Sequence, residues 1–182
     1  MAILKVARLG HPVLRTPAEP IRSVHAPEIQ RLIDDMLETM REYAGIGLAA
    51  PQVHRSLQLC MVEGSEGLRT DHGEEWPRSP LVLINPRITA VTDRTEEDWE
   101  GCLSLPDLRG KVPRYIEIQV QALDRQGRPR QFTAADFLAR VIQHETDHLN
   151  GVVYVDRMRD LSTLTHLAEW NRYWLGVQEQ DD

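Results

Sequence analysis

The feature that most constrains this chain is the pattern H-E-x-x-H between His144 and His148. If the stretch is helical, both histidines project from one face, because residues four apart lie one turn above each other. Two imidazoles placed this way can bind one divalent cation, and Glu145 would then lie where it can take a proton from a bound water. The alternative is a surface helix with two incidental histidines, since so short a pattern also occurs by chance.

The residues around this pattern favour a helix. Thr133 and Asp136 fit a capping box, in which a hydroxyl side chain and an acidic side chain cap the first turn. Gly151 suits the position just after a helix C-terminus. Apolar residues recur between these ends at helical spacing: Phe137, Leu138, Val141, Ile142 and Leu149. We therefore expect a helix that starts near Thr133 and stops before Gly151.

A catalytic metal site needs a third protein ligand besides the two histidines, with one position left for water. The residue that would supply a third histidine in an extended motif is Tyr154, which excludes that protease class. Glu169 lies downstream at the distance at which a thermolysin-like site takes its glutamate. Cys102, which follows Gly101, offers a thiolate, a strong ligand for zinc or Fe(II). Spacing does not choose between Glu169 and Cys102, and a structural site would lack a fourth ligand.

The composition describes an ordinary globular protein. With 182 residues, 41% of them hydrophobic, the chain is expected to form one domain over residues 1–182. The net charge of −7 argues against direct binding to nucleic acid or to anionic membranes. The two cysteines, Cys60 and Cys102, suggest no disulfide framework. The sequence has no apolar run long enough to span a membrane and no secretory signal, so we expect a cytoplasmic protein.

The remaining pattern predicts an α+β fold with mostly antiparallel strands around the helix that carries H-E-x-x-H. Pro27 begins an amphipathic helix whose apolar stripe runs to Tyr43. We expect a second amphipathic helix at the C-terminus, from Leu161 to Trp174. The predicted strands are 57–62, 81–85 (ending at Pro86), 116–122, 128–132 and 152–155. Residues 63–80 are expected to form an exposed excursion, and 92–98 an acidic turn.

The segment Gly45-Ile46-Gly47-Leu48-Ala49-Ala50-Pro51-Gln52 contains the pattern G-x-G-x-x-A. A dinucleotide-binding turn needs a strand before this pattern and a helix after it. Here a helix precedes it and Pro51 would interrupt the helix that should follow, so we exclude that interpretation. We expect a loop whose backbone comes close to a ligand. Gln52 could be an amide donor to a developing oxyanion, or only a solvated side chain.

Three segments taken together resemble the peptide deformylase family. They are the Gly45–Gln52 segment, Glu100-Gly101-Cys102-Leu103-Ser104-Leu105, and Gln143-His144-Glu145-Thr146-Asp147-His148. The intervening sequence is also similar, and the resemblance extends to about residue 158. It implies that Cys102, rather than Glu169, joins His144 and His148 as a metal ligand.

The resemblance also implies an activity and roles for individual residues. The reaction would be hydrolysis of the N-formyl group of N-formylmethionine at the start of new polypeptides, with release of formate. Metal-bound hydroxide would attack the formyl carbonyl, and Glu145 would be the general base and then the general acid. The side chain of Gln52 and the N–H of Leu103 would stabilise the oxyanion. Fe(II) would be the physiological ion, with Zn(II) or Ni(II) found in preparations.

The family further implies that the substrate backbone pairs with Ile46, Gly47 and Gly101, with Arg109 near the cleft. A pocket for the methionine side chain would lie beside the motif helix. Residues on its face include Phe137, Arg140 and Val141.

Arg140 departs from the apolar residue common in bacterial members, so its charge would need a partner or access to water.

The resemblance also implies a partner for the whole protein, which is the formylated nascent chain at the ribosome. The protein itself would be a monomer or a weak homodimer.

Two readings from other classes compete with the deformylase prediction. One is a zinc endopeptidase that uses His144, His148 and Glu169, in which Cys102 would be dispensable. The other is a module without catalytic activity, in which the metal or the bare helix is structural.

Overall fold

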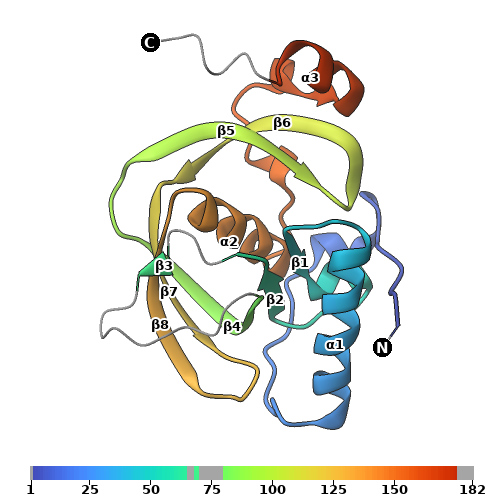
Figure 1. Cartoon of the computed structure of the whole chain (residues 1–182), viewed down its shortest axis with the longest axis vertical. Coiled ribbons are helices and arrows are strands. Elements are labelled where there is room, and N and C mark those ends of the chain that lie inside the picture. Colours follow the sequence, from blue (N-terminus) through green and yellow to red (C-terminus); the bar gives the residue numbers. More distant parts are fainter. Residues whose placement is uncertain (1, 65–67, 70–79, 176–182) are drawn as a thin grey trace.

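The computed structural model describes residues 2–64, 68–69 and 80–175, and within them the predicted α+β class is confirmed. The named strands pair antiparallel in two sheets, one of six strands in the order β1-β2-β4-β7-β8-β3 and one of three in the order β5-β6-β9 (Figure 1). The strands are β1 Gly47–Ala49, β2 Leu59–Val62, β3 Leu68–Arg69, β4 Leu81–Ala90, β5 Thr95–Cys102, β6 Leu105–Tyr115, β7 Glu117–Leu123, β8 Pro129–Ala135 and β9 Thr165–His166. The helices are α1 Pro27–Glu42, α2 Asp136–Leu149 and α3 Leu167–Tyr173, with 3-10 turns at Pro12–Arg15, Ala50–Val53, Tyr154–Asp156 and Leu161–Thr163.

Helix α2 contacts strands of both sheets and carries the H-E-x-x-H residues (Figure 1). Its apolar side packs on the larger sheet, where Leu138 and Ile142 join a core that includes Phe132. Its other residues are also buried, and these are mostly polar: Arg140, Gln143, His144, Glu145, Thr146, Asp147 and His148. Burying so many polar groups costs free energy unless each finds a partner. This side of the helix is therefore a candidate functional site.

Helix α1 begins at Pro27 as predicted and covers the edge of the larger sheet. Ile33, Met36 and Met40 are fully buried there and belong to one cluster with Leu48 and Met61. Burying each such side chain contributes about 1.5–3 kcal/mol to the stability of the fold. The packing of α1 on Leu48 and Met61 therefore helps to hold β1 beside β2.

Tyr43 was predicted to continue the buried stripe, which is wrong: it lies beyond the last helical residue with 42% of its surface exposed. The helix ends one residue earlier, which turns this side chain out of the core.

The predicted start of α2 at Thr133 is also wrong. Thr133 lies in β8, where it pairs with Gln119 of β7, and the helix begins at Asp136 with no side-chain cap. Strand pairing takes precedence over the local capping pattern because it continues to Ala135. The helix C-terminus follows the prediction, since Gly151 has a φ of +74°, a value that favours glycine.

Three strand predictions need correction. Strand β4 does not stop at Pro86 but continues to Ala90, because the register shifts between Ile84 and Arg87 and the bulge accommodates the proline. Residues 95–98 belong to strand β5 and are not part of a turn; 95–97 are exposed, which explains their acidic composition. The segment 152–155 is not a strand, and its end joins the 3-10 turn at Tyr154–Asp156.

Two further expectations concern residues 63–80 and the C-terminal helix. Of the predicted excursion at 63–80, residues 65–67 and 70–79 lie outside the described residues, while Leu68–Arg69 form β3 against β8. The C-terminal helix is shorter than predicted, since Leu161–Thr163 form a 3-10 turn and α3 starts at Leu167. In the described part of the chain, no helix has both the length and the apolar character needed to cross a membrane.

Candidate metal centre

Three side chains with metal-binding atoms meet where the end of β5 approaches α2. They are Cys102, His144 and His148, whose ligand atoms all lie within 4.8 Å of one another. The Cys102 Sγ is 3.3 Å from His148 Nε2. By contrast, Glu169 is exposed on α3 and is not part of this cluster. The geometry therefore brings together the cysteine and the two histidines, and leaves the competing carboxylate outside.

The surroundings of Cys102 favour its thiolate. Burial alone would raise the pKa of the thiol, but the charges and hydrogen bonds of His148 and His144 hold that pKa well below its usual range. A thiolate and two imidazoles form a donor set suited to Zn(II) or Fe(II). With three protein ligands, such a site keeps a position for water or substrate, as catalytic sites do. The residues present therefore fit a divalent transition-metal ion.

Glu100 orients His144 from the side away from Cys102. Its Oε2 lies 2.8 Å from His144 Nδ1, so the imidazole donates from Nδ1 and keeps Nε2 for an ion. Although burial would raise the pKa of Glu100, hydrogen bonds from His144 and Arg114 lower it to about 2. The sequence pattern gives Glu100 no role, because its contact with His144 joins residues 44 apart and its strand forms through pairing with β6.

Two buried arginines hold the Glu100 carboxylate in place. Arg114 donates to both of its oxygens, at 2.9 and 3.0 Å, and Arg140 donates to Oε1 at 3.0 Å. Arg114 also donates to Asp147 on α2 at 2.6 Å. This network ties the smaller sheet to the motif helix on both sides of His144. Its charged members are buried and paired, the condition under which buried ions are tolerated.

The guanidinium of Arg140 points toward β5 and β6. Besides Glu100, it donates to the backbone carbonyls of Val112 and Glu96, each at 2.8 Å. The partner that an arginine in this position was expected to need is therefore a carboxylate within the protein. Arg140 lines the cavity, but its positive charge is balanced by the carboxylate of Glu100.

Replacing Glu100 with glutamine is expected to weaken metal binding by about 10–100-fold, the usual effect of removing the carboxylate behind a metal-bound imidazole. The variant should also melt at a lower temperature, because two buried guanidiniums lose their shared anion. Competition with a chelator, followed by metal analysis, measures the affinity. Glu97→Gln, an exposed change on the same strand, is the matched control. Equal metal affinity in the Glu100→Gln and wild-type proteins would contradict the role given to Glu100.

Glu145 lies beside the cluster and against β1. It is 3% exposed, and burial raises the pKa of its carboxyl to about 7, a range suited to accepting and returning a proton near neutral pH. A Cβ added to Gly47 would fall 2.3 Å from Glu145 Oε1 and 2.8 Å from its Cγ. Gly47 is thus the residue whose missing side chain leaves room for this carboxylate.

The amide of Gln52 has a fixed orientation. Its Oε1 accepts a hydrogen bond from the Ala49 N–H at 2.8 Å, so its Nε2 must be the group directed at the cluster. Nε2 lies 3.4 Å from Cys102 Sγ and 3.3 Å from Ser104 Oγ. The side chain is buried, and this excludes the alternative of a solvated loop glutamine.

A cavity of about 670 Å³ opens onto this cluster. Its lining includes Cys102, His144, Glu145, Gln52 and Leu103. All seven residues predicted for substrate contact line it as well: Ile46, Gly47, Gly101, Arg109, Phe137, Arg140 and Val141. Its lining also includes residues that the sequence pattern did not place there: Arg8, Tyr43, Ala44, Trp99, Glu100, Pro106, Asp107, Leu167 and Trp170. The aromatic ones among them resemble core residues in the sequence pattern, so no local signal distinguishes them.

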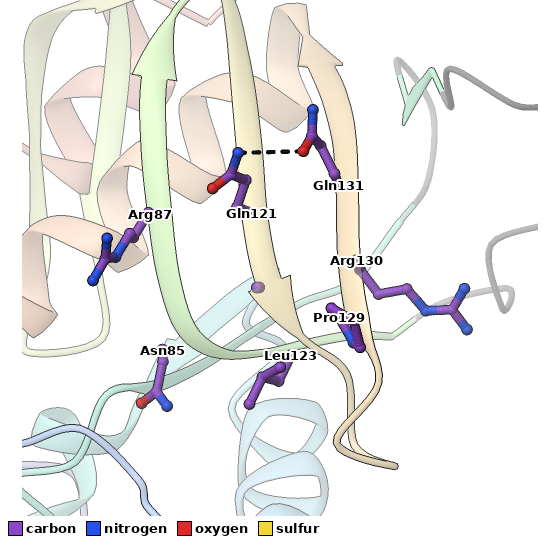
Figure 2. A pocket seen from close by; sticks show the side chains of 8 residues that line it. Asn85, Arg87, Gln121, Leu123, Pro129, Arg130 and Gln131 are labelled. Atoms are coloured by element: carbon purple, nitrogen blue, oxygen red, sulfur yellow. Dashed lines mark hydrogen bonds between the residues drawn. The ribbon is translucent and has the colours of Figure 1, made fainter.

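A second cavity, of about 380 Å³, lies on strands β4, β7 and β8 (Figure 2). Its lining contains arginines and amides, among them Gln121 and Gln131, which are hydrogen-bonded at 3.2 Å. Among the described residues, its lining includes no thiol, imidazole or carboxylate. Since Zn(II) and Fe(II) favour thiolate and imidazole ligands, the cavity beside Cys102 is the candidate site.

Comparisons with known proteins agree on one family. The family profile described as polypeptide deformylase matches residues 3–163. Peptide deformylase 2 of Nostoc sp. is 42% identical over 164 residues, which are 90% of each chain. A peptide deformylase from Acinetobacter baumannii with Met-Ala-Ser bound is 34% identical, with a TM-score of 0.77 over 86% of this chain and 99% of that one. The Ehrlichia chaffeensis deformylase with actinonin is 33% identical, with a TM-score of 0.79 over 90% and 92%.

Proposed function

This chain belongs to the polypeptide deformylase family, and from that premise we propose how its own residues carry out the family's reaction. Members of the family are metal-dependent hydrolases that remove the N-formyl group from nascent peptides. The observation that carries the proposal is the cluster of Cys102, His144 and His148, of which Cys102 and His144 line a cavity together with Glu145 and Gln52. We assign this activity to a single domain spanning residues 1–182, with the motif helix at its centre.

Cys102, His144 and His148 would hold one divalent ion per chain, with Fe(II) as the physiological ion and Zn(II) or Ni(II) in preparations. Such an ion supplies a Lewis acid that polarises a carbonyl and lowers the pKa of a bound water. Glu100 would hold His144 in the tautomer that the site requires. Since selection among these ions depends on availability and geometry, the ligand set alone is compatible with each of them.

Glu145 would accept a proton from the attacking water and then deliver it to the amine that leaves. Its burial keeps the pKa of the free carboxyl close to neutrality, which suits a group that must do both. The Gln52 Nε2 and the backbone N–H of Leu103 would donate to the oxyanion that develops on the formyl oxygen. Because Ala49 holds the amide of Gln52, this donor needs no reorientation during the reaction.

The substrate would bind as an extended strand. Strand β1 is at the edge of the six-stranded sheet, and Gly47 at its start lines the cavity. One edge of the bound peptide would pair with the backbone of Ile46 and Gly47, and its other edge would pair with the backbone of Gly101. The methionine side chain would enter the part of the cavity lined by Phe137, Arg140 and Val141. We place the protein in the cytoplasm, with new chains at the ribosome as substrate, as a monomer or weak homodimer.

Replacing Gly47 with alanine is expected to lower kcat by about 10²-fold, because the new methyl group displaces the Glu145 carboxylate from its position. Stability should change little, since only a side-chain end has to move. Formate release and thermal melting measure the two effects. Gly64→Ala, where nothing lies within 4 Å of an added Cβ, is the control for activity and should keep the wild-type kcat. Unchanged kcat in Gly47→Ala would contradict this placement of Glu145.

The proposal is tested with formyl-Met-Ala-Ser and protein stripped of metal, then reloaded anaerobically with Fe(II). We expect formate from the reloaded protein and none from the stripped protein. A longer, unformylated peptide, whose internal peptide bonds an endopeptidase could cleave, serves as the competing substrate. Cleavage of that peptide without formate release would refute the deformylase assignment and favour an endopeptidase.

A further inference from the structure

The match to the deformylase family ends at residue 163. Leu167 and Trp170 come after this match in the sequence, and both line the cavity. Both belong to α3, which follows β9 directly (Figure 1). Strand β9 pairs with β6, where Thr165 lies opposite Arg109. The C-terminal segment is therefore attached to the rim of the cavity through backbone pairing, and its helix adds a wall that the matched part of the chain does not supply.

Trp170 lies against Arg109, and Arg109 lies against the backbone next to Cys102. The Cζ of Arg109 is 6.0 Å from the centre of the Trp170 ring, within the range of a cation–π contact. A Cβ on Gly101 would fall 1.8 Å from Arg109 Nη1, so the guanidinium covers Gly101 directly. Among the described residues, no carboxylate forms an ion pair with Arg109, whereas Arg114 and Arg140 share Glu100.

A second indole extends the surface. Trp99 on β5 packs edge-on against Trp170, with ring centres 6.2 Å apart and planes at 70°. Lys111 Nζ lies 5.5 Å from the centre of the Trp99 ring. The result is an apolar surface of Trp99, Leu167 and Trp170 beside the guanidinium of Arg109, which donates to the Leu108 carbonyl at 3.0 Å and has no carboxylate partner among the described residues. Such a surface favours an aliphatic or aromatic side chain and a backbone carbonyl, and disfavours a basic side chain.

We propose that Trp170, supplied by α3, is a specificity-determining residue that, with Arg109, forms a subsite for an apolar side chain downstream of the formylmethionine. This deepens the proposed function and rests on it. The Arg109 guanidinium covers Gly101, where the substrate backbone is proposed to pair, and the Trp170 ring lies next to that guanidinium, so both side chains are placed to contact the residues that follow the formylmethionine. The subsite therefore reads the second or third residue of the substrate.

The test compares formyl-Met-Ala-Leu, formyl-Met-Leu-Ala and formyl-Met-Ala-Lys in the Fe(II)-loaded enzyme. We expect at least one of the two leucine peptides to exceed the lysine peptide by about tenfold in kcat/KM in the wild type. The position of leucine in the preferred peptide identifies the substrate residue that the subsite contacts. In Trp170→Ala that preference should shrink through a higher KM for the leucine peptide, with kcat within about twofold, because the indole is lost while the charge of Arg109 remains; Trp170→Phe should retain most of the preference. Trp174→Ala is the matched control, because Trp174 also packs on Trp99, at 5.7 Å, but does not line the cavity.

Three results would overturn the inference: an unchanged preference in Trp170→Ala, a loss of kcat with KM unchanged, or an equal loss in Trp174→Ala. A wild type that releases no formate would instead refute the proposed function. Calorimetric binding of the product peptides Met-Ala-Leu and Met-Ala-Lys needs no turnover and tests the subsite separately. With Met-Leu-Ala included as a third product peptide, we expect Trp170→Ala to bind one of the two leucine peptides about tenfold more weakly than the wild type; equal binding of both leucine peptides by the two proteins would contradict the subsite.

Discussion

Replacing Cys102 with alanine is expected to abolish both metal retention and formate release. The thiol is the one ligand that the smaller sheet provides, and the remaining histidines come from a single helix. Two imidazoles four residues apart leave half of a four-coordinate shell to water, so the ion should be lost on dialysis. Metal analysis after dialysis and formate assays on the same samples measure the effect. Formate release should fall to the level of the metal-stripped wild type.

Two controls make this result specific. Cys60→Ala removes the other cysteine, which is fully buried and has a thiol pKa that burial raises, so it should keep its metal and its activity. Glu169→Ala removes the carboxylate that an endopeptidase of the thermolysin type would need. Loss of metal in Glu169→Ala, with retention in Cys102→Ala, would contradict the account and support that alternative.

Replacing Glu145 with glutamine should lower kcat by about 10²–10⁴-fold and leave the metal in place. The amide keeps the shape of the side chain against Gly47 but cannot accept the proton of the attacking water. Glu145 is also outside the cluster of three ligand atoms, so its charge is not needed to hold the ion. Formate assays with equal metal content in both proteins measure the difference.

The conservative change Glu145→Asp separates chemistry from packing. Aspartate restores a carboxylate about one methylene short of the original position, so its activity should lie between those of the glutamine variant and the wild type. Activity of Glu145→Gln within about threefold of wild type, at full metal occupancy, would exclude a role in proton transfer.

The chemistry of the centre was accessible from the sequence because it depends on helical periodicity. His144 and His148 are four apart in a helix that the apolar spacing predicts, and the structure brings Cys102 to them. What periodicity could not provide was the choice between Cys102 and Glu169. That choice depends on how β5 lies against α2, a contact between segments about forty residues apart, and it came instead from the family resemblance.

The fold was predictable where a pattern is local and was missed where pairing decides. Pro27 and the stripe after it identify α1, whereas Gly47–Ala49 and the acidic start of β5 become strands only through their partners. Thr133 follows the same rule, since sheet pairing overrides a capping pattern. The network around Glu100 and the wall at Trp170 were missed because each joins segments far apart in the sequence.

The most direct test of the central claim is a titration of the metal-stripped protein with Fe(II), with the initial rate of formate release from formyl-Met-Ala-Ser recorded at each step. The claim is that one ion per chain, held by Cys102, His144 and His148, is required for the reaction. The rate should therefore rise linearly and stop rising at one ion per chain. A rate independent of added ion, or one that keeps rising well beyond one ion per chain, would contradict it.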